Sequence, residues 1–425
     1  MNRMRGDSLV IGFALFSMFF GAGNVIFPPY LGLSCGSQWF LGFACYYLAD
    51  IGLALLAIFA ILHCGDSQGI TRRAGRGASA LLMSAIVLCI GPMLAIPRTA
   101  ALTYEMSVGP LVSGFSPVLF SVLFFLLIFL LCVRESAVVD IVGKILTPVL
   151  LLGLLALIVK GVLMPIGPVP DRVLVENVPF TGIEAGYQTM DVLAALVFGI
   201  IILKSARDKG HTGSGDLYRV VAGAALVAGT ALLVVYLGLT YLGVSASRFF
   251  GLDVPRTFLV VSIVRNLMGS WGIGLFSVVV ALACITTAVA LTSSAASYFS
   301  QLSDGRLSYP ILVGLVCAFS AVVSNVGLEQ IVAIAAPILN IVYPPTLVLI
   351  FLAFCDGIIR TDRVYRFAAL GAFLTSLLTA AADFGLPVAD LMSRMPLSSL
   401  GFQWVLPAVV CGLLGALPIG RRRRR

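Results

Sequence analysis

The sequence has little charge and almost no histidine. Of its 425 residues only 11% are charged and two are histidines, whereas 60% are hydrophobic. A soluble globular protein carries about 25% charged residues, and a chain this apolar has too little polar sequence to cover the surface of a water-soluble core. The composition excludes an ordinary soluble protein and predicts that lipid surrounds most of the chain.

Motifs for metal-dependent catalysis and nucleotide hydrolysis are also missing. The sequence contains no H-E-x-x-H motif and no Walker motif, and its nine cysteines include no C-x-x-C pair. Most of those cysteines lie inside apolar runs, where a thiol packs as a small apolar group. These absences argue against an enzyme, an ATP-driven pump and a disulfide framework, and we expect no bound cofactor.

Long apolar runs are what the sequence does contain. A helix needs about 20 mostly apolar residues to cross a bilayer. Twelve runs qualify, near residues 9–33, 39–62, 78–103, 114–133, 141–163, 180–204, 217–243, 271–301, 308–325, 328–353, 364–384 and 399–419. The sequence predicts an all-α polytopic membrane protein of about twelve transmembrane helices, forming a single transmembrane domain over residues 1–425.

The 27 lysines and arginines are divided unevenly between the two sides of this arrangement. An even number of spans places both termini on one side, and most basic residues fall on that side. Cytoplasmic loops carry an excess of Lys and Arg, so both termini are predicted to be cytoplasmic, with Arg421–Arg425 touching anionic lipid headgroups. The scattered positive charge does not predict binding to nucleic acid, and no obligate protein partner is implied.

The first apolar run contains a concentration of residues that interrupt helices, from Gly21 to Pro29 in the order GAGNVIFPP. Pro28 and Pro29 lack an N–H group, so the carbonyls of Asn24 and Val25 lose their helical donors. Irregular backbone inside a membrane is tolerated where it lines a cavity. We predict that this helix is broken at Gly21-Ala22-Gly23-Asn24 to form part of a binding site; a close helix crossing with a proline kink is the alternative.

The tenth run repeats the same device. Asn340 to Pro345 read NIVYPP, which again places an asparagine four residues before a proline pair. By the same reasoning the carbonyls of Asn340 and Ile341 lose their helical donors. The repetition predicts a second distorted helix, with a role in gating.

Acidic residues inside the spans are costly, by about 2.5–3.5 kcal/mol on insertion scales, and therefore indicate function. Asp191 interrupts the sixth run, which is also expected to be discontinuous. It can bind a cation, carry a proton or face an ammonium group; a structural pairing with Arg98 is the alternative. Asp50 is a weaker candidate because neither glycine nor proline accompanies it, and Arg98 and Glu105 are expected to pair with other charges near the outer surface.

Hydroxyl groups cluster in the eighth run at Thr286-Thr287 and, a little further on, at Thr292-Ser293-Ser294. Hydroxyl oxygens are suited to Na⁺, which also accepts backbone carbonyls as ligands. The alternative is hydrogen bonding of these hydroxyls to carbonyls of the preceding turn, which is common in membrane helices. The cluster favours an ion site.

Several of these segments resemble the bacterial branched-chain amino acid:cation symporters of the amino acid–polyamine–cation superfamily. The matching segments are Phe20–Pro29, Pro97–Ala100, Gly186–Asp191, Thr287–Val289, Ser324–Leu328 and Tyr343–Pro345. They follow the family order over nearly the whole chain.

The resemblance implies import of leucine, isoleucine and valine across a bacterial cytoplasmic (inner) membrane, coupled to Na⁺ or alternatively to H⁺. It also implies a LeuT-like fold with a five-plus-five inverted repeat, in which residues 9–163 mirror residues 180–353 and helices over 364–419 are additional. In such folds transport proceeds by alternating access around broken helices one and six.

The site residues follow from the same resemblance. Substrate contacts are expected from Gly21, Ala22, Gly23, Asn24, Asp191 and Phe198. The coupling ion is expected at carbonyls near Phe20 and Gly23 together with Thr286 and Thr287, with Ser293 and Ser294 as the alternative. A transporter of another apolar amino acid such as methionine, and an ion channel, are the alternative functions.

Overall fold

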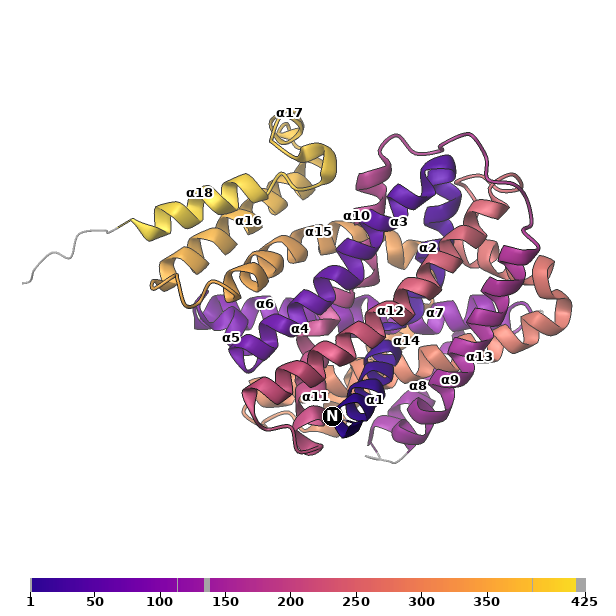
Figure 1. Cartoon of the computed structure of the whole chain (residues 1–425), viewed down its shortest axis with the longest axis horizontal. Helices are drawn as coiled ribbons and strands as arrows, with labels where there is room; N and C mark the ends of the chain where they lie inside the picture. The colour runs from indigo at the N-terminus through magenta and orange to yellow at the C-terminus, as the bar shows by residue number, and fades with distance from the viewer. Residues whose placement is uncertain (1, 113, 134–137, 384, 418–425) are drawn as a thin grey trace, which may run out of the picture. The chain divides into compact units, whose positions relative to one another are not determined.

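The computed structural model is helical, without strands, over the residues that it describes, which are 2–112, 114–133, 138–383 and 385–417 (Figure 1). The chain forms two compact units. One consists of Met1–Leu55 with Val87–Ala336, and the other of Leu56–Ile86 with Pro337–Arg425. The predicted lipid anchor at Arg421–Arg425 lies outside the described residues.

The first unit holds most of the helices. Their bounds are α1 (Asn2–Phe19), α2 (Ala22–Cys35), α3 (Trp39–Tyr47), α7 (Ala95–Thr103), α8 (Pro117–Val133), α9 (Val138–Leu163), α10 (Val178–Thr189), α11 (Asp191–Asp208), α12 (Ser214–Ala246), α13 (Arg256–Leu302) and α14 (Tyr309–Ser324). Short π-helical turns at Leu48–Gly52, Cys89–Met93 and Tyr104–Val108 continue the second and third spans.

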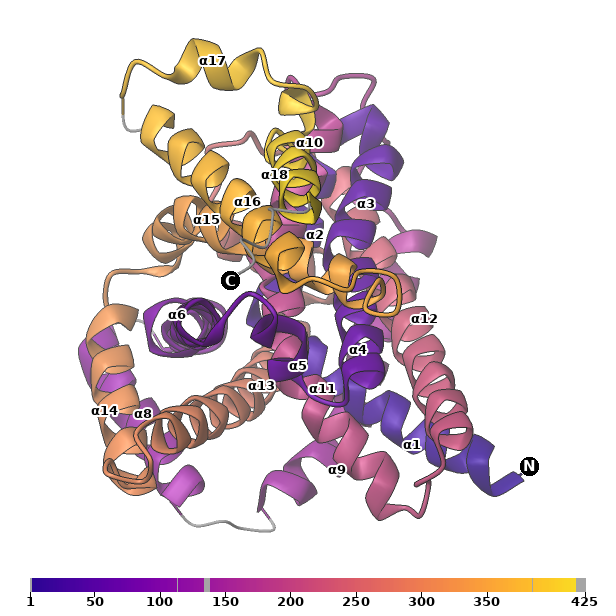
Figure 2. The ribbon, with the colours of Figure 1, turned by 90° about the vertical axis from the view of Figure 1, so that its left-hand side faces the viewer.

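The second unit is smaller. Its helices are α4 (Leu53–Cys64), which begins in the first unit, α5 (Ser67–Arg72), α6 (Arg76–Leu88), α15 (Leu328–Ala353), which also begins in the first unit, α16 (Asp362–Asp383), α17 (Ala389–Ser393) and α18 (Val405–Ala416). Helices α16 and α18 pack side by side (Figure 2). The two helices approach closely because Gly371 of α16, which has no Cβ atom, lies against Cys411 of α18.

Within the described part of the chain, six helical stretches are long and apolar enough to cross a membrane: Ala22–Cys64, Arg76–Val108, Ser214–Ala246, Arg256–Leu302, Leu328–Ala353 and Asp362–Asp383. The pair α10 and α11, bent by 41°, can form a seventh. Shorter apolar helices cover Pro117–Val133, Leu150–Leu163, Tyr309–Ser324 and Val405–Ala416. The prediction of an all-helical, multi-pass membrane protein is confirmed, while the number of twelve spans and the inverted repeat stay predictions.

The first span is interrupted, but over a shorter stretch than predicted. Helix α1 ends at Phe19 and α2 begins at Ala22, so only Phe20 and Gly21 lie outside a helix. Pro28 and Pro29 lie inside α2, which was not expected. The neighbouring helix α12 holds this part of α2, because the carbonyl of Pro29 lies directly against Gly243.

The sixth span is interrupted at one residue. Met190 has a left-handed backbone (φ 67°) between α10 and α11 and is 2% exposed. A buried non-glycine residue in this region is strained and persists only where surrounding packing enforces it. The discontinuity expected in this span is therefore present, and it lies immediately before Asp191.

The tenth span differs from its prediction. Helix α15 runs from Leu328 to Ala353 and contains Pro337, Pro344 and Pro345 without an interruption. The predicted distortion at Asn340–Pro345 is not a break. A proline inside a membrane helix is tolerated where neighbouring groups satisfy the carbonyls that it releases.

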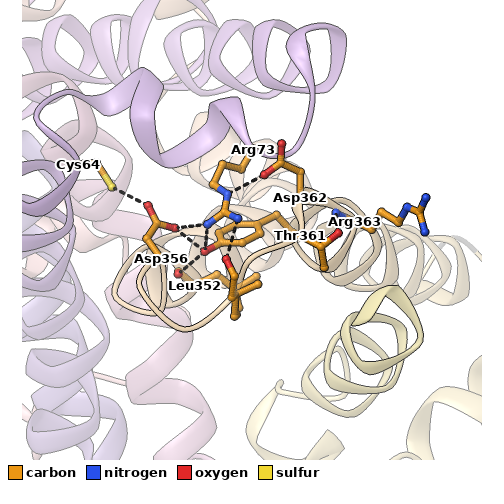
Figure 3. Close-up of polar contacts among 9 residues, drawn as sticks. Cys64, Arg73, Leu352, Asp356, Thr361, Asp362 and Arg363 are labelled. Carbon is orange, nitrogen blue, oxygen red and sulfur yellow. Dashed lines mark hydrogen bonds and ion pairs between the residues drawn. The ribbon is translucent and has the colours of Figure 1, made fainter. Parts of the chain in front are cut away.

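Arg73 organises one end of the second unit (Figure 3). Its guanidinium donates at 2.8 Å to Asp356, which follows α15, and at 2.8 Å to Asp362, the first residue of α16. It also donates to the carbonyl of Ile359 at 2.8 Å and lies 3.9 Å above the ring of Tyr365. Arg73 thereby joins the segment after α5 to both ends of the connection between α15 and α16.

Contact between α2 and α12 gives a test of the fold. A Cβ atom on Gly32 would overlap the carbonyl of Thr240, which is backbone and cannot rotate away. We expect Gly32→Ala to lower the free energy of unfolding by about 3 kcal/mol, at the upper end of the usual range for overpacking.

Gly274 of α13 is the matched control, because nothing lies within 4 Å of its Cβ position. Gly274→Ala is expected to leave the thermal midpoint of the purified protein unchanged or slightly raised, since alanine favours helix. Equal losses in the two variants would contradict the assigned packing of α2 on α12.

Candidate functional site

The two interrupted spans meet at a small cavity in the first unit. All six residues expected to contact substrate line it, namely Gly21, Ala22, Gly23, Asn24, Asp191 and Phe198. Arg98, Thr189, Met190 and Thr287 also line it. The cavity measures about 30 Å³, which is room for about one or two water molecules and not for an amino acid side chain. The structure thus shows a closed arrangement of this region.

Asn24 connects one interruption to the other. It is 1% exposed, and its Nδ2 donates to Oδ2 of Asp191 at 2.8 Å and also to the carbonyl of Phe19, the last residue of α1. Its Oδ1 has no hydrogen-bond partner among the residues that the structure describes. A buried acceptor without a partner costs about 1–3 kcal/mol, so this oxygen is a suitable point for a ligand.

Arg98 lies at the cavity and not near the outer surface, where the sequence had placed it. Its side chain is buried, and its guanidinium donates to the carbonyls of Gln188 at 2.6 Å and Thr189 at 3.2 Å. These carbonyls belong to the last turn of α10, where a helix leaves its acceptors unpaired. A positive charge at this end is also favoured by the helix dipole, so Arg98 stabilises the break at Met190.

Arg98 also explains the glycine at position 23. A Cβ atom on Gly23 would lie 2.8 Å from Nη2 of Arg98 and 3.3 Å from the ring of Phe27. The glycine therefore makes room for the guanidinium beside α2. Sequence reasoning missed this role of Arg98, although an arginine inside a span was a signal that it needed polar partners.

Glu105 forms hydrogen bonds to a hydroxyl and a backbone N–H within the first unit. Its carboxylate accepts from the hydroxyl of Thr257 at 2.8 Å and from the backbone N–H of Leu328 at 3.0 Å. The expectation that it pairs with another charge is wrong. It instead joins the start of α13 to the start of α15.

Asp50, the weaker candidate of the sequence analysis, is joined to the cavity through Thr189, although it does not line it. It is fully buried in the π-helical turn Leu48–Gly52, and its Oδ1 accepts from the hydroxyl of Thr189 at 2.8 Å. The same hydroxyl accepts from the backbone N–H of Asp191 at 3.4 Å, so Thr189 links Asp50 to Asp191. Asp50 lies in a π-helical turn, and such turns are frequent at functional sites. A π-helical turn cannot be recognised from the sequence alone, because tertiary contacts determine it.

The predicted ion ligands are only partly brought together. The hydroxyl of Thr287 is buried without a partner among the described residues and lies 3.6 Å from the Cβ position of Gly21. In contrast, the hydroxyl of Thr286 donates to the carbonyl of Ala283 at 2.8 Å, and that of Ser293 contacts the sulfur of Cys132 at 3.5 Å. Phe20, Thr286, Ser293 and Ser294 do not line the cavity.

The fold and the site together define a membrane transporter: apolar spans are interrupted at buried charges, and the interruptions enclose a cavity. The family follows from sequence comparison. The model of the family described as "Branched-chain amino acid transport protein" matches residues 4–419, and the chain belongs to this family. A branched-chain amino acid permease of Bacillus subtilis, BraB, is 36% identical over 421 residues, covering 96% of this chain and 94% of the permease. Because the relatives are permeases, the chain is a transporter and not an enzyme.

Solved transporters share the fold at low sequence identity. A Na⁺-coupled sialic acid symporter matches with a TM-score of 0.62 at 14% identity, covering 97% of this chain and 90% of the symporter. MhsT, solved in complex with L-phenylalanine, matches with a TM-score of 0.58 at 16% identity, covering 96% and 98%. These likenesses concern the fold alone.

Arg98 provides the test of the site's architecture. Replacement by glutamine removes the charge at the end of α10 and leaves two buried carboxylates close by, so Arg98→Gln is expected to lower the free energy of unfolding by about 3–5 kcal/mol. Arg98→Lys keeps the charge but cannot hold both carbonyls in the same fork, so an intermediate loss is expected.

Arg265 is the control for this series, since it is exposed on α13. Arg265→Gln should change the free energy of unfolding, measured by denaturant titration, by less than about 0.5 kcal/mol. An Arg98→Gln protein as stable as the Arg265→Gln protein would show that the bonds to α10 do not hold the break.

Proposed function

We propose that the protein is a secondary symporter that imports the branched-chain amino acids leucine, isoleucine and valine together with Na⁺. Transport proceeds by alternating access around the breaks between α1 and α2 and between α10 and α11. The observation that carries the proposal is that the start of α2 and the carboxylate of Asp191 line one cavity. A zwitterionic amino acid needs one positive and one negative partner, and this cavity offers both.

The substrate carboxylate is assigned to the start of α2. The first N–H groups of a helix have no intrahelical acceptor and carry the positive end of the helix dipole. Gly21 precedes this helix and gives it no side-chain cap. A carboxylate placed here would meet the N–H groups of Ala22 and Gly23 without interference from a side chain.

The ammonium group is assigned to Asp191. Its carboxylate accepts from Asn24, and its backbone N–H donates to the hydroxyl of Thr189, which bonds Asp50. If both buried carboxyls are ionised beside the single guanidinium, one negative charge is uncompensated, and a buried charge is costly unless it is paired. One positive charge, from the substrate ammonium, a coupling cation or a proton, balances the site.

The apolar side chain of the substrate is assigned to the side of the cavity formed by Phe198. This ring is 2% exposed and lies 6.4 Å from the ring of Phe19 at the end of α1. An aromatic pair beside the breaks forms an apolar wall for a branched aliphatic group. Because the cavity is closed in the structure, the two wall elements must separate to admit it, as alternating access requires.

The coupling ion is assigned to Thr287 and to the carbonyls around Phe20 and Gly23. Thr287 is favoured within the predicted set because its buried hydroxyl is without a described partner and lies beside Gly21. Thr286 is less favoured because it does not line the cavity, although a hydroxyl that donates to the carbonyl of Ala283 keeps lone pairs for a cation. H⁺, carried by the carboxylates of Asp50 and Asp191, is the alternative coupling ion.

The topology proposed with this function has twelve spans in a bacterial cytoplasmic membrane, with both termini cytoplasmic. Residues 9–163 and 180–353 form the inverted repeats, and the helices over 364–419 are additional. The interruptions after Phe19 and at Met190 lie in the first and sixth spans of this scheme, which is where an inverted repeat of five helices would place corresponding breaks.

Uptake of radiolabelled leucine into proteoliposomes, with and without an inward Na⁺ gradient, tests the proposal. We expect saturable uptake that the gradient accelerates and that unlabelled isoleucine and valine inhibit. Uptake that follows a proton gradient alone would transfer the coupling to H⁺. Absence of leucine uptake, or a conductance that does not saturate with leucine, would contradict the symport proposal.

Thr287→Val tests the ion assignment. Loss of one hydroxyl ligand is expected to raise the Na⁺ concentration for half-maximal uptake about tenfold, with a smaller change in the KM for leucine. Thr286→Val is the control, since Thr286 does not line the cavity, and its Na⁺ dependence should change less than about threefold. Equal effects of the two substitutions on Na⁺ and on leucine would argue against the assignment.

Asp191→Asn tests the charge balance. The amide keeps the size of the side chain but removes the charge that faces the ammonium group, so initial leucine uptake should fall about 30-fold or more, as for loss of one partner of a buried charge pair. Asp216→Asn, at the exposed start of α12, should retain at least about half of the uptake. Undiminished leucine uptake by Asp191→Asn would remove this residue from the substrate site.

A further inference from the structure

A deep apolar groove lies in the second unit, away from the cavity described above. It measures about 390 Å³ and is lined by one face each of α6, α15 and α16. On α16 the lining residues follow the helical repeat, from Arg366 through Ala369 and Leu370 to Phe373. Small side chains on α6, such as Ala78, leave space for the groove. Three helices together therefore form the groove.

The groove extends over most of the depth of one lipid leaflet. Its lining runs along α6 from Ala78 to Ala85 and along α16 from Arg366 to Phe373, a rise of about 10 Å on each helix at 1.5 Å per residue, and it continues to Ala74 before α6. Half of the hydrocarbon core of a bilayer is about 15 Å thick. An acyl chain that starts at Arg366 would fill the groove.

A single charge stands at one end of this groove. Arg366 is its only charged lining residue, and a Cβ atom on Gly75, the residue before α6, would lie 3.6 Å from Nε of Arg366. The guanidinium forms no ion pair with any carboxylate in the described part of the chain. Arg366 thus presents an uncompensated positive charge where the groove begins.

The neighbouring arginines do not share this position. Arg73 is held by Asp356, Asp362 and the carbonyl of Ile359 (Figure 3). Arg363, three residues before Arg366 on α16, extends away from the Arg73 cluster in the same view and does not line the groove. Arg76, at the start of α6 beside Gly75, is exposed and does not line the groove either. Among the described lining residues, Arg366 therefore supplies the charge.

We propose that this groove is a binding site for an anionic glycerophospholipid. One acyl chain lies between α6, α15 and α16, and the phosphate of the headgroup contacts Arg366. Charge complementarity argues for an anionic headgroup, because a zwitterionic lipid brings its own cation to the same place. The acyl chain supplies the apolar surface that the helices leave uncovered, and arginine is well suited to a phosphate because its fork donates two hydrogen bonds.

Native mass spectrometry of the purified full chain tests this site. The probes are phosphatidylglycerol and phosphatidylcholine with identical acyl chains, added together at equal concentration. We expect the unaltered protein to retain one phosphatidylglycerol preferentially. Arg366→Gln should lower the ratio of bound phosphatidylglycerol to phosphatidylcholine about fivefold, the effect of one arginine at a headgroup, whereas Arg366→Lys should keep most of the preference.

Two further variants separate the parts of the proposal. Arg363→Gln removes the same charge from the same helix outside the groove and should leave the ratio unchanged. Ala78→Leu fills the groove and should reduce the amount of either lipid retained, while Arg366 stays in place. The proposal would be overturned if Arg363→Gln and Arg366→Gln had equal effects, if Ala78→Leu retained all of its lipid, or if the unaltered protein showed no preference. Binding of a second copy of the chain in place of lipid would also overturn it.

Discussion

Polar groups released inside a membrane have to be satisfied by the protein itself, and the site depends on this constraint. No water surrounds the spans, so each unpaired backbone group would cost several kcal/mol. The side chain of Asn24 accordingly binds the last carbonyl of α1, and the guanidinium of Arg98 binds the last carbonyls of α10. Hydrogen bonds from these two residues offset the energetic cost of the breaks. The polar atoms that stay unpaired around them are the proposed contacts for a substrate or an ion.

The need to satisfy buried polar groups also determines where the charged side chains lie. Arg98 is required at the end of α10, and its positive charge allows Asp191 to remain beside Asn24 at the start of α11. Asp50 joins through the hydroxyl of Thr189, from a π-helical turn of another span. Asn24 and Arg98 thus hold the interrupted backbone, and the acidic groups of Asp191 and Asp50 beside them are the ones proposed to meet a cation.

The small volume of the cavity is consistent with the proposed alternating access, in which the site opens to each side of the membrane in turn. Met190 is held in a left-handed conformation between two helices bent by 41°, and such strained residues cluster at functional sites and at switch regions. Under the proposed alternating access, a change of the angle between α10 and α11 at Met190 would separate Phe198 from Phe19 and enlarge the cavity, because the two rings belong to α11 and α1.

Local properties of the sequence determined that the chain is an all-helical membrane protein, where its apolar runs lie, and that the first and sixth spans are weakened near Gly21 and Asp191. Composition and short motifs suffice for this, because insertion into lipid and helix interruption depend on neighbouring residues. Tertiary structure alone decided that Arg98 and Asp50 belong to the site, that Pro29 stays helical against Gly243, and that Thr287 rather than Thr286 faces the cavity. Each of these outcomes depends on residues from distant spans meeting in a medium without water, where the partner that a polar group finds is set by packing and not by its place in the sequence.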